Sequence, residues 1–251
     1  MSRPLATVIG MGPGLGQALV RRFAEAGFAV AFVGRNAAAL AGYEAAMRAE
    51  GLDVAGFAGD AGEPAQMAPV HRAIAARYGE PEVLVYNAAI IEPARFVTRS
   101  GLAEAQYGNA PGWSARGEPA DTDYLMATFR TNVAGAHDAA RTVAPGMIAR
   151  GRGTILLTGG VLAFGPWIEW GVTSLGKAAL RSLGHSLFKE LAPSGVQAVT
   201  VAIHGTMEAG TPYDHRLVAG AYLDLHRRPQ SEWTPDHHFK AADQSEGDPD
   251  A

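Results

Sequence analysis

The chain has 251 residues, a formal net charge of −4, no cysteine and 47% hydrophobic residues. This length and composition suit one large α/β domain, exclude disulfides and cysteine-ligated zinc, and provide no basic field for nucleic acid. The most apolar stretch, residues 154–168, is interrupted by glycines and a proline, whereas a membrane span needs roughly 20 apolar residues. We therefore expect no nucleic-acid partner and no membrane insertion. Because no signal-peptide pattern precedes the first apolar run, we expect a cytoplasmic location.

Short apolar runs alternate with longer segments of helical spacing along the chain. The runs predict strands at residues 5–9, 29–33, 54–57, 83–86, 154–158 and 196–203. The segments between them predict helices at residues 15–26, 37–50, 64–78, 124–150 and 172–191. This alternation is typical of βαβ units around a parallel sheet. It predicts an α/β fold, a Rossmann-like doubly wound parallel sheet, in a single domain of residues 1–240. The acidic, turn-rich tail at 241–251 is expected to be disordered.

A glycine-rich turn follows the first predicted strand. Gly10, Gly14 and Gly16, with Leu15 between the last two, stand at the start of the first predicted helix. Glycines in this position let the backbone approach a pyrophosphate and direct free N–H groups at it. The turn therefore predicts a nucleotide site.

The spacing of these glycines resembles the fingerprint of the short-chain dehydrogenase/reductase family. Further motifs along the chain resemble those of the family and occur in the family's order. They include Asp60 in AGDAG, Asn87 in YNAA, Asn132 in TNVAG and Lys177 in SLGKAAL. The resemblance implies that Asp60 and the adjacent Ala61 contact the adenine, and that Asn87, Ala88 and Ala89 lie beside the cofactor. It also implies that Asn132 holds a water in a proton relay, that Lys177 binds the nicotinamide ribose, and that the protein is a homodimer or homotetramer.

The end of the second predicted strand indicates which cofactor is used. An acidic residue there would accept a hydrogen bond from the ribose 2′-hydroxyl and disfavour a 2′-phosphate. This chain has Arg35 and Asn36 instead, and the planar guanidinium of arginine suits a phosphate. The pattern favours NADP(H) over NAD, with a solvated arginine at a helix start as the alternative.

The resemblance fails at the catalytic positions. The family's tyrosine precedes the lysine by four residues, and that position is Thr173; its serine lies about thirteen residues earlier still, at Gly160. An aliphatic hydroxyl is a far weaker acid than a phenol. Thr173 is therefore either an unusual proton donor or a residue that positions a ligand or caps the helix, and Gly160 leaves room for substrate.

Two other residues are candidates for the missing chemistry. His204 follows the sixth predicted strand beside the expected nicotinamide, and histidine exchanges protons near neutrality most readily; the alternative is a structural histidine. Glu169 lies between Trp167 and Trp170, where a carboxylate could have a raised pKa or hold a cationic substrate. A solvated loop glutamate is the alternative reading.

Two segments are expected to shape the substrate pocket. Residues 90–123 form an insertion relative to the family, read as a lid, an oligomer contact or an exposed loop, and Tyr107 or Tyr124 could restore the missing phenol. Residues 204–235 match the family's variable substrate loop, in which Tyr213 and Tyr222 are candidates for pocket lining or for packing. His237 and His238 have no third ligand at a suitable spacing, so no metal site is expected.

The sequence thus predicts an NADPH-dependent oxidoreductase that reduces a C=N (imine or iminium) or C=O group of a small organic substrate with a non-standard proton donor. Loss of the serine and tyrosine is least harmful for an imine, because a protonated iminium is already electrophilic. The alternative is a non-redox NADP-binding protein, either regulatory or a biosynthetic cyclase or dehydratase.

Overall fold

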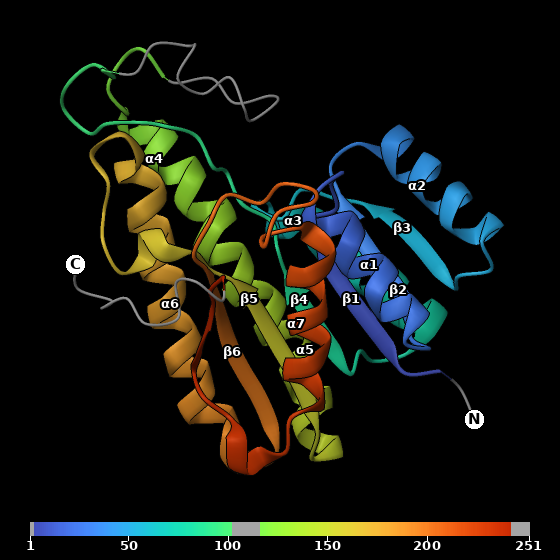
Figure 1. The fold of residues 1–251 in the computed structure, drawn as a ribbon. Helices are drawn as coiled ribbons and strands as arrows, with labels where there is room; N and C mark the ends of the chain where they lie inside the picture. The colour runs from blue at the N-terminus through green and yellow to red at the C-terminus, as the bar shows by residue number, and fades with distance from the viewer. Residues whose placement is uncertain (1–2, 102–115, 242–251) are drawn as a thin grey trace.

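The apolar runs of the sequence form the strands of one parallel sheet in the computed structural model, which describes residues 3–101 and 116–241. The strand order is β3-β2-β1-β4-β5-β6-β7, and Figure 1 labels the first six of these strands. The strands are β1 (Leu5–Ile9), β2 (Ala29–Gly34), β3 (Val54–Ala58), β4 (Val83–Tyr86), β5 (Gly153–Thr158), β6 (Val196–Ile203) and β7 (Asp236–Phe239). The order reverses between β1 and β4, and open α/β sheets bind ligands beyond the carboxyl ends of the strands at such a point.

Six of these strands confirm the sequence prediction, and β7 was missed. Its residues are Asp-His-His-Phe, which carry no apolar run. β7 pairs only with β6, at the edge of the sheet, so it is not buried on both faces and lacks the apolar signature of the inner strands.

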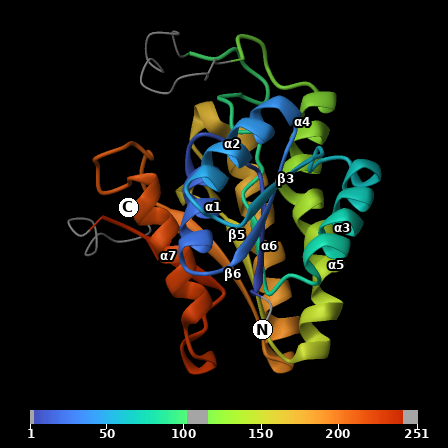
Figure 2. The same ribbon diagram turned by 90° about the vertical axis from the view of Figure 1, so that its right-hand side faces the viewer.

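Helices connect the strands on both sides of the sheet (Figure 2). They are α1 (Leu15–Glu25), α2 (Ala37–Ala49), α3 (Pro64–Tyr78), α4 (Thr122–Phe129), α5 (Gly135–Arg150), α6 (Gly171–Leu191) and α7 (His215–Arg227). The single helix predicted at 124–150 is interrupted by a π-helical segment, Arg130–Ala134, which joins α4 to α5. Such segments are rare and often mark functional positions, and Asn132 lies within this one.

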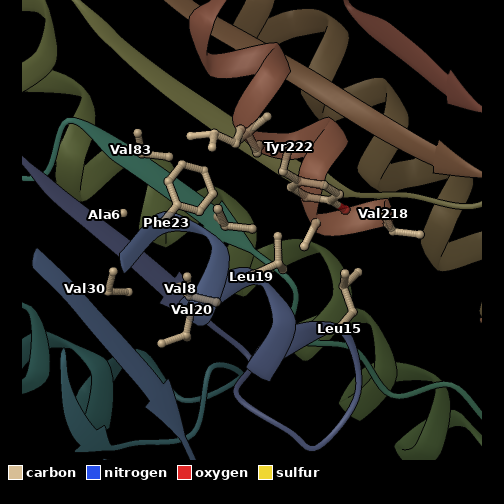
Figure 3. Close-up of a cluster of buried hydrophobic side chains, with 14 of the residues drawn as sticks. Ala6, Val8, Leu15, Leu19, Val20, Phe23, Val30, Val83, Val218 and Tyr222 are labelled. Atoms are coloured by element: carbon tan, nitrogen blue, oxygen red, sulfur yellow. The ribbon is translucent and has the colours of Figure 1, made fainter. Parts of the chain in front are cut away.

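The core is divided by the sheet into two apolar clusters, because successive residues of a strand point to opposite faces. On one face, β1 and β4 pack against α1, α2 and α7. On the other, they pack against α3, α5 and α6. Figure 3 shows part of the first cluster, in which Phe23 of α1 and Tyr222 of α7 lie among the strand side chains.

Among the described residues, no helix combines the length and apolar character that a bilayer crossing requires. Of the predicted disordered tail, only Ala241 is described, and it is buried. Tyr107, in the insertion, lies outside the described residues.

Candidate functional site

The glycine-rich turn is shaped by close packing between β1, α1 and the end of β4. Gly10 has a φ of +106°, and a Cβ there would overlap the backbone nitrogen of Ala88. A Cβ on Gly16 would lie 2.5 Å from the carbonyl oxygen of Gly10. Asn87 holds the same turn, since its Nδ2 donates to the Gly10 oxygen at 2.9 Å. These two glycines are therefore required by the backbone path itself.

The first turn of α1 carries no capping side chain, although the His215 ring lies against Gly14 and the Gln17 N–H donates to the Gly12 oxygen at 2.9 Å. Its N-cap, Gly14, makes no side-chain capping bond, and no acidic residue stands in the turn. The backbone N–H groups of the first turn have no partner within a helix, and the helix dipole adds positive potential there. A strand, a tight glycine turn and an uncapped helix start are the features with which proteins bind a pyrophosphate, and the pyrophosphate contact here remains a prediction.

A cavity of about 180 Å³ opens beside this turn at the switch point of the sheet. It brings together seven residues predicted from the sequence to bind the cofactor: Gly10, Arg35, Asp60, Ala61, Asn87, Ala88 and Ala89. Thr131, from the π-helical segment, also lines it and was not predicted. The cavity and the turn fit the adenosine half of a dinucleotide.

Three polar side chains near the cavity differ in the contacts that they make. Arg35 is exposed at its rim and forms no ion pair with another described residue. The Oδ1 atom of Asp60 accepts from the Gly62 nitrogen at 2.9 Å, which keeps the carboxylate at the cavity wall. The side chain of Asn36 caps α2, since its Oδ1 accepts from the Ala39 nitrogen at 3.0 Å.

Asn132 fixes the loop that follows β4. Its side chain is buried, its Oδ1 accepts from the Ile90 nitrogen at 2.7 Å, and its Nδ2 donates to the Ile90 oxygen at 3.0 Å. One N–H and one acceptor position of the amide remain for a further partner. The water-holding role implied by the resemblance remains a prediction; the structure adds a positioning role for the loop.

The lysine of the family motif lies at the carboxyl end of β5. The Nζ of Lys177 donates to the Thr158 carbonyl oxygen at 2.7 Å, and burial lowers its pKa to about 8. One helical turn earlier, Thr173 is buried, and its Oγ1 donates to the Glu92 carbonyl oxygen at 3.3 Å. The Thr173 hydroxyl is thus directed at backbone, which suits a structural role better than proton donation.

Gly160 leaves open space where the family has serine. Its φ is 171°, an extended conformation that any residue adopts. A Cβ there would meet only the Ile203 oxygen, at 3.9 Å. Gly160 therefore has no hydroxyl to replace the family's serine, and the hydroxyl of Thr173, which donates to a backbone carbonyl, is a poor replacement for the family's tyrosine.

The expectation of a raised pKa at Glu169 is wrong. Hydrogen bonding with Arg95 lowers the pKa of this carboxyl, assisted by bonds from the Ser100 hydroxyl at 2.8 Å and the Gly101 nitrogen at 3.1 Å. The carboxylate is buried in an ion pair with Arg95. Because Arg95 lies 74 positions away in the chain, sequence spacing gave no sign of the pair.

The tryptophans around Glu169 do not form the expected apolar walls for that carboxylate. Trp167 is 58% exposed, and Trp170 is half-buried at the start of α6. The carboxylate instead faces the loop that follows β4, through Arg95. Its function is to hold that loop against α6.

His204 forms a pair with a histidine of the missed strand. Its Nε2 lies 2.8 Å from Nδ1 of His238, and Phe164 stacks near both rings. Burial, followed by His238 and Lys240, lowers the pKa of His204 to about 4. At pH 7 only about one molecule in a thousand would carry imidazolium there, so His204 is a neutral hydrogen-bonding group and not a ready acid. The described residues contain no group of three or more His, Asp or Glu side chains able to hold a metal ion.

Tyr213 and Tyr222 are buried in the core, so of the two alternatives left open by the sequence, pocket lining and packing, the structure shows packing. Tyr222 is fully buried, and its hydroxyl donates to Thr158 Oγ1 at 2.9 Å. Tyr213 packs against Gly205, and its hydroxyl accepts from the Ala241 nitrogen at 3.0 Å. Both tyrosines lie on the face of the sheet that α1 and α7 cover.

Glu92, in the insertion, contacts Thr173 and is also bonded to Tyr124 of α4. Besides its carbonyl bond to Thr173, Glu92 accepts at Oε2 from the hydroxyl of Tyr124 at 3.2 Å. Sequence reasoning named Tyr124 but missed Glu92, which carries no motif.

Known dehydrogenases and reductases are similar to this chain over most of its length. The family model described as "short chain dehydrogenase" matches residues 4–216. An uncharacterized oxidoreductase of Thermotoga maritima is 28% identical over 79% of this chain and 69% of its own. A granaticin polyketide synthase putative ketoacyl reductase of Streptomyces violaceoruber is 37% identical, but the match spans only 35% of this chain and 32% of that protein.

Among solved structures, a gluconate 5-dehydrogenase from Burkholderia cenocepacia in complex with NADP and tartrate is 27% identical. It superposes with a TM-score of 0.68 over 95% of this chain and 84% of its own. The likeness in three dimensions therefore extends over nearly the whole chain.

Proposed function

Because the chain belongs to the short-chain dehydrogenase family of oxidoreductases, we propose that it is an NADPH-dependent reductase of a C=N or C=O group in a small organic substrate. The observation that carries the cofactor choice is Arg35, exposed at the rim of the switch-point cavity without an ion-pair partner among the described residues. A guanidinium in this position would bind the 2′-phosphate. The NADP bound to the gluconate 5-dehydrogenase supports the same choice.

The residues of the site would divide the work of holding the cofactor. The uncapped first turn of α1 would bind the pyrophosphate, and the Gly10 turn lets it approach. Lys177 has three N–H donors, of which the Thr158 oxygen takes one, leaving two for ribose hydroxyls. Asn132 keeps the loop after β4 beside the site. NADPH, when bound, supplies the hydride.

The missing donors favour a C=N substrate. Gly160 carries no hydroxyl, the Thr173 hydroxyl faces a backbone carbonyl, and His204 is neutral at pH 7. Reduction of a ketone creates an alkoxide that needs a proton at once, whereas a protonated iminium needs none at the hydride step. A carbonyl substrate is the second candidate, and the name of the granaticin ketoacyl reductase supports it.

The proposal is tested by NADPH consumption with a matched pair of substrates, a five-membered cyclic imine and the cyclic ketone of the same shape. We expect turnover of the imine to exceed that of the ketone. NADPH oxidation with neither, despite tight NADPH binding, would remove the reductase proposal. Conversion detected by mass spectrometry without NADPH oxidation would then identify a cyclase or dehydratase.

Arg35→Glu tests the cofactor assignment separately. A hydrogen bond to a charged group contributes about 1.5–3 kcal/mol, so we expect NADPH affinity to fall about 10- to 100-fold while NADH affinity changes little. Arg72→Glu, an exposed charge reversal on α3, is the control. Equal losses of NADPH and NADH affinity would contradict a 2′-phosphate contact. We also propose a homodimer or homotetramer, which sedimentation of the purified protein checks.

A further inference from the structure

Glu92 stands next to the position where the family carries its tyrosine. Its carbonyl oxygen accepts from Thr173 Oγ1, and its carboxylate accepts from the hydroxyl of Tyr124 on α4. Ile90, two positions before Glu92, is held through its backbone N–H and carbonyl, both of which bond to the side-chain amide of Asn132. The half-buried Glu92 is therefore held at its carboxylate by Tyr124 of α4 and at its backbone carbonyl by Thr173 of α6.

The charges around this centre are unequally compensated. The carboxylate of Glu169 is neutralised by Arg95 and accepts two further hydrogen bonds. By contrast, Glu92 forms no ion pair within the described residues. The guanidinium of Arg116 lies over the Tyr124 ring, 3.9 Å from the centroid, and 3.8 Å from the Asp121 carboxylate.

Tyr124 keeps this carboxylate oriented without neutralising it. Burial, followed by the charge of Glu92, raises the pKa of the phenol to about 12. The phenol therefore remains protonated at neutral pH and acts as a hydrogen-bond donor. A half-buried carboxylate with one neutral donor still gains from a cationic partner.

We infer that Glu92, oriented by Tyr124, is the subsite for the positively charged nitrogen of an iminium substrate and of its amine product. Glu92 thus takes the role of holding a cationic substrate, which the sequence had suggested for Glu169. The inference rests on the proposed function for the location of the substrate, and it narrows the substrate class to cyclic or N-substituted imines that are protonated at neutral pH.

The chemistry balances without a phenol acting as acid. Hydride from NADPH forms the new C–H bond, and the π pair of the C=N bond becomes the lone pair of the nitrogen. The amine leaves the step neutral and takes its next proton from water. The carboxylate of Glu92 accepts a hydrogen bond from the nitrogen before and after the step and is not itself consumed.

Binding of a product-like cation tests this subsite without turnover. The protein saturated with NADP⁺ is titrated calorimetrically with 2-methylpyrrolidine, which is protonated at pH 7, and with the neutral 2-methylcyclopentanol. We expect Glu92→Gln to weaken binding of the cation about 10-fold and to leave the neutral ligand unchanged. Glu118→Gln removes the same charge from the same insertion, at a side chain that is 65% exposed, and is expected to change neither.

Two further variants keep the test decisive if Glu92→Gln folds poorly. Glu92→Asp retains the charge and is expected to recover part of the cation affinity, whereas Tyr124→Phe is expected to lose less than Glu92→Gln. Equal effects of these variants on the cation and on the alcohol would overturn the inference. With active enzyme, Glu92→Gln should raise KM for the imine and leave KM for the ketone unchanged.

These results separate the subsite from the reductase proposal. Glu92-dependent cation binding without NADPH oxidation would retain the subsite and remove the reductase. Imine reduction that is indifferent to Glu92→Gln would retain the reductase and remove the subsite.

Discussion

Replacing Tyr222 by phenylalanine distinguishes a core tyrosine from a substrate-binding one. The ring is fully buried between α1 and the sheet, and the substitution keeps it, so no cavity forms (Figure 3). Only the bond from its hydroxyl to Thr158 Oγ1 is lost. A hydrogen bond of this kind contributes about 1 kcal/mol net, rising toward 3 kcal/mol if the remaining partner stays buried and unsatisfied. For a chain of this size, each kcal/mol lowers Tm by about 2–4 °C.

The assay compares urea denaturation with substrate and cofactor binding for the same variant. We expect a loss of about 1–3 kcal/mol in unfolding free energy, with unchanged KM and unchanged NADPH affinity. The double variant Tyr222→Phe with Thr158→Val should lose less than the sum of the two single changes, because it removes both partners at once. A tenfold change in KM with wild-type stability would refute the core assignment and return Tyr222 to the substrate pocket.

Three further predictions concern the glycine turn, the positions Gly160 and Thr173, and the buried Lys177. Gly10→Ala should abolish NADPH binding and lower Tm, since its Cβ overlaps backbone and its φ is positive; wild-type affinity by fluorescence titration would contradict the close approach. Gly160→Ser should fold with wild-type stability because open space surrounds it, whereas Thr173→Tyr overpacks a buried position and should cost about 1–3 kcal/mol in urea denaturation. The reverse order of stabilities would refute this. For Lys177, burial depresses the folded-state pKa to about 8, below the unfolded value near 10.4. The unfolded chain then binds more protons between these pH values, so stability rises with pH from about 8 to 10. Lys177→Met should flatten this rise of the unfolding free energy with pH. The control Lys189→Met, at an exposed lysine, should leave it unchanged. Equal slopes for Lys177→Met and the wild type would show that Lys177 is not desolvated.

Local patterns in the sequence were enough to predict the sheet and the tight glycine turn after β1. Inner parallel strands are buried on both faces, so their apolar runs are visible without any partner being known. The glycine turn follows from steric limits on the backbone. Gly10 and Gly16 indeed stand where a Cβ would collide with backbone. The assignment of Gly160 and Thr173 to the family's catalytic positions came from spacing alone and remains a prediction.

Only the tertiary structure decided which side chains face the site and which charges remain uncompensated. The ion pair of Glu169 with Arg95 and the bond from Tyr124 to Glu92 join segments that are 74 and 32 positions apart, and no local pattern records such a contact. The edge strand that pairs His238 with His204 was hidden because an edge position needs no apolar run. The chain thus specifies its backbone through short-range sterics and burial, whereas the electrostatics of the candidate site arise from long-range packing.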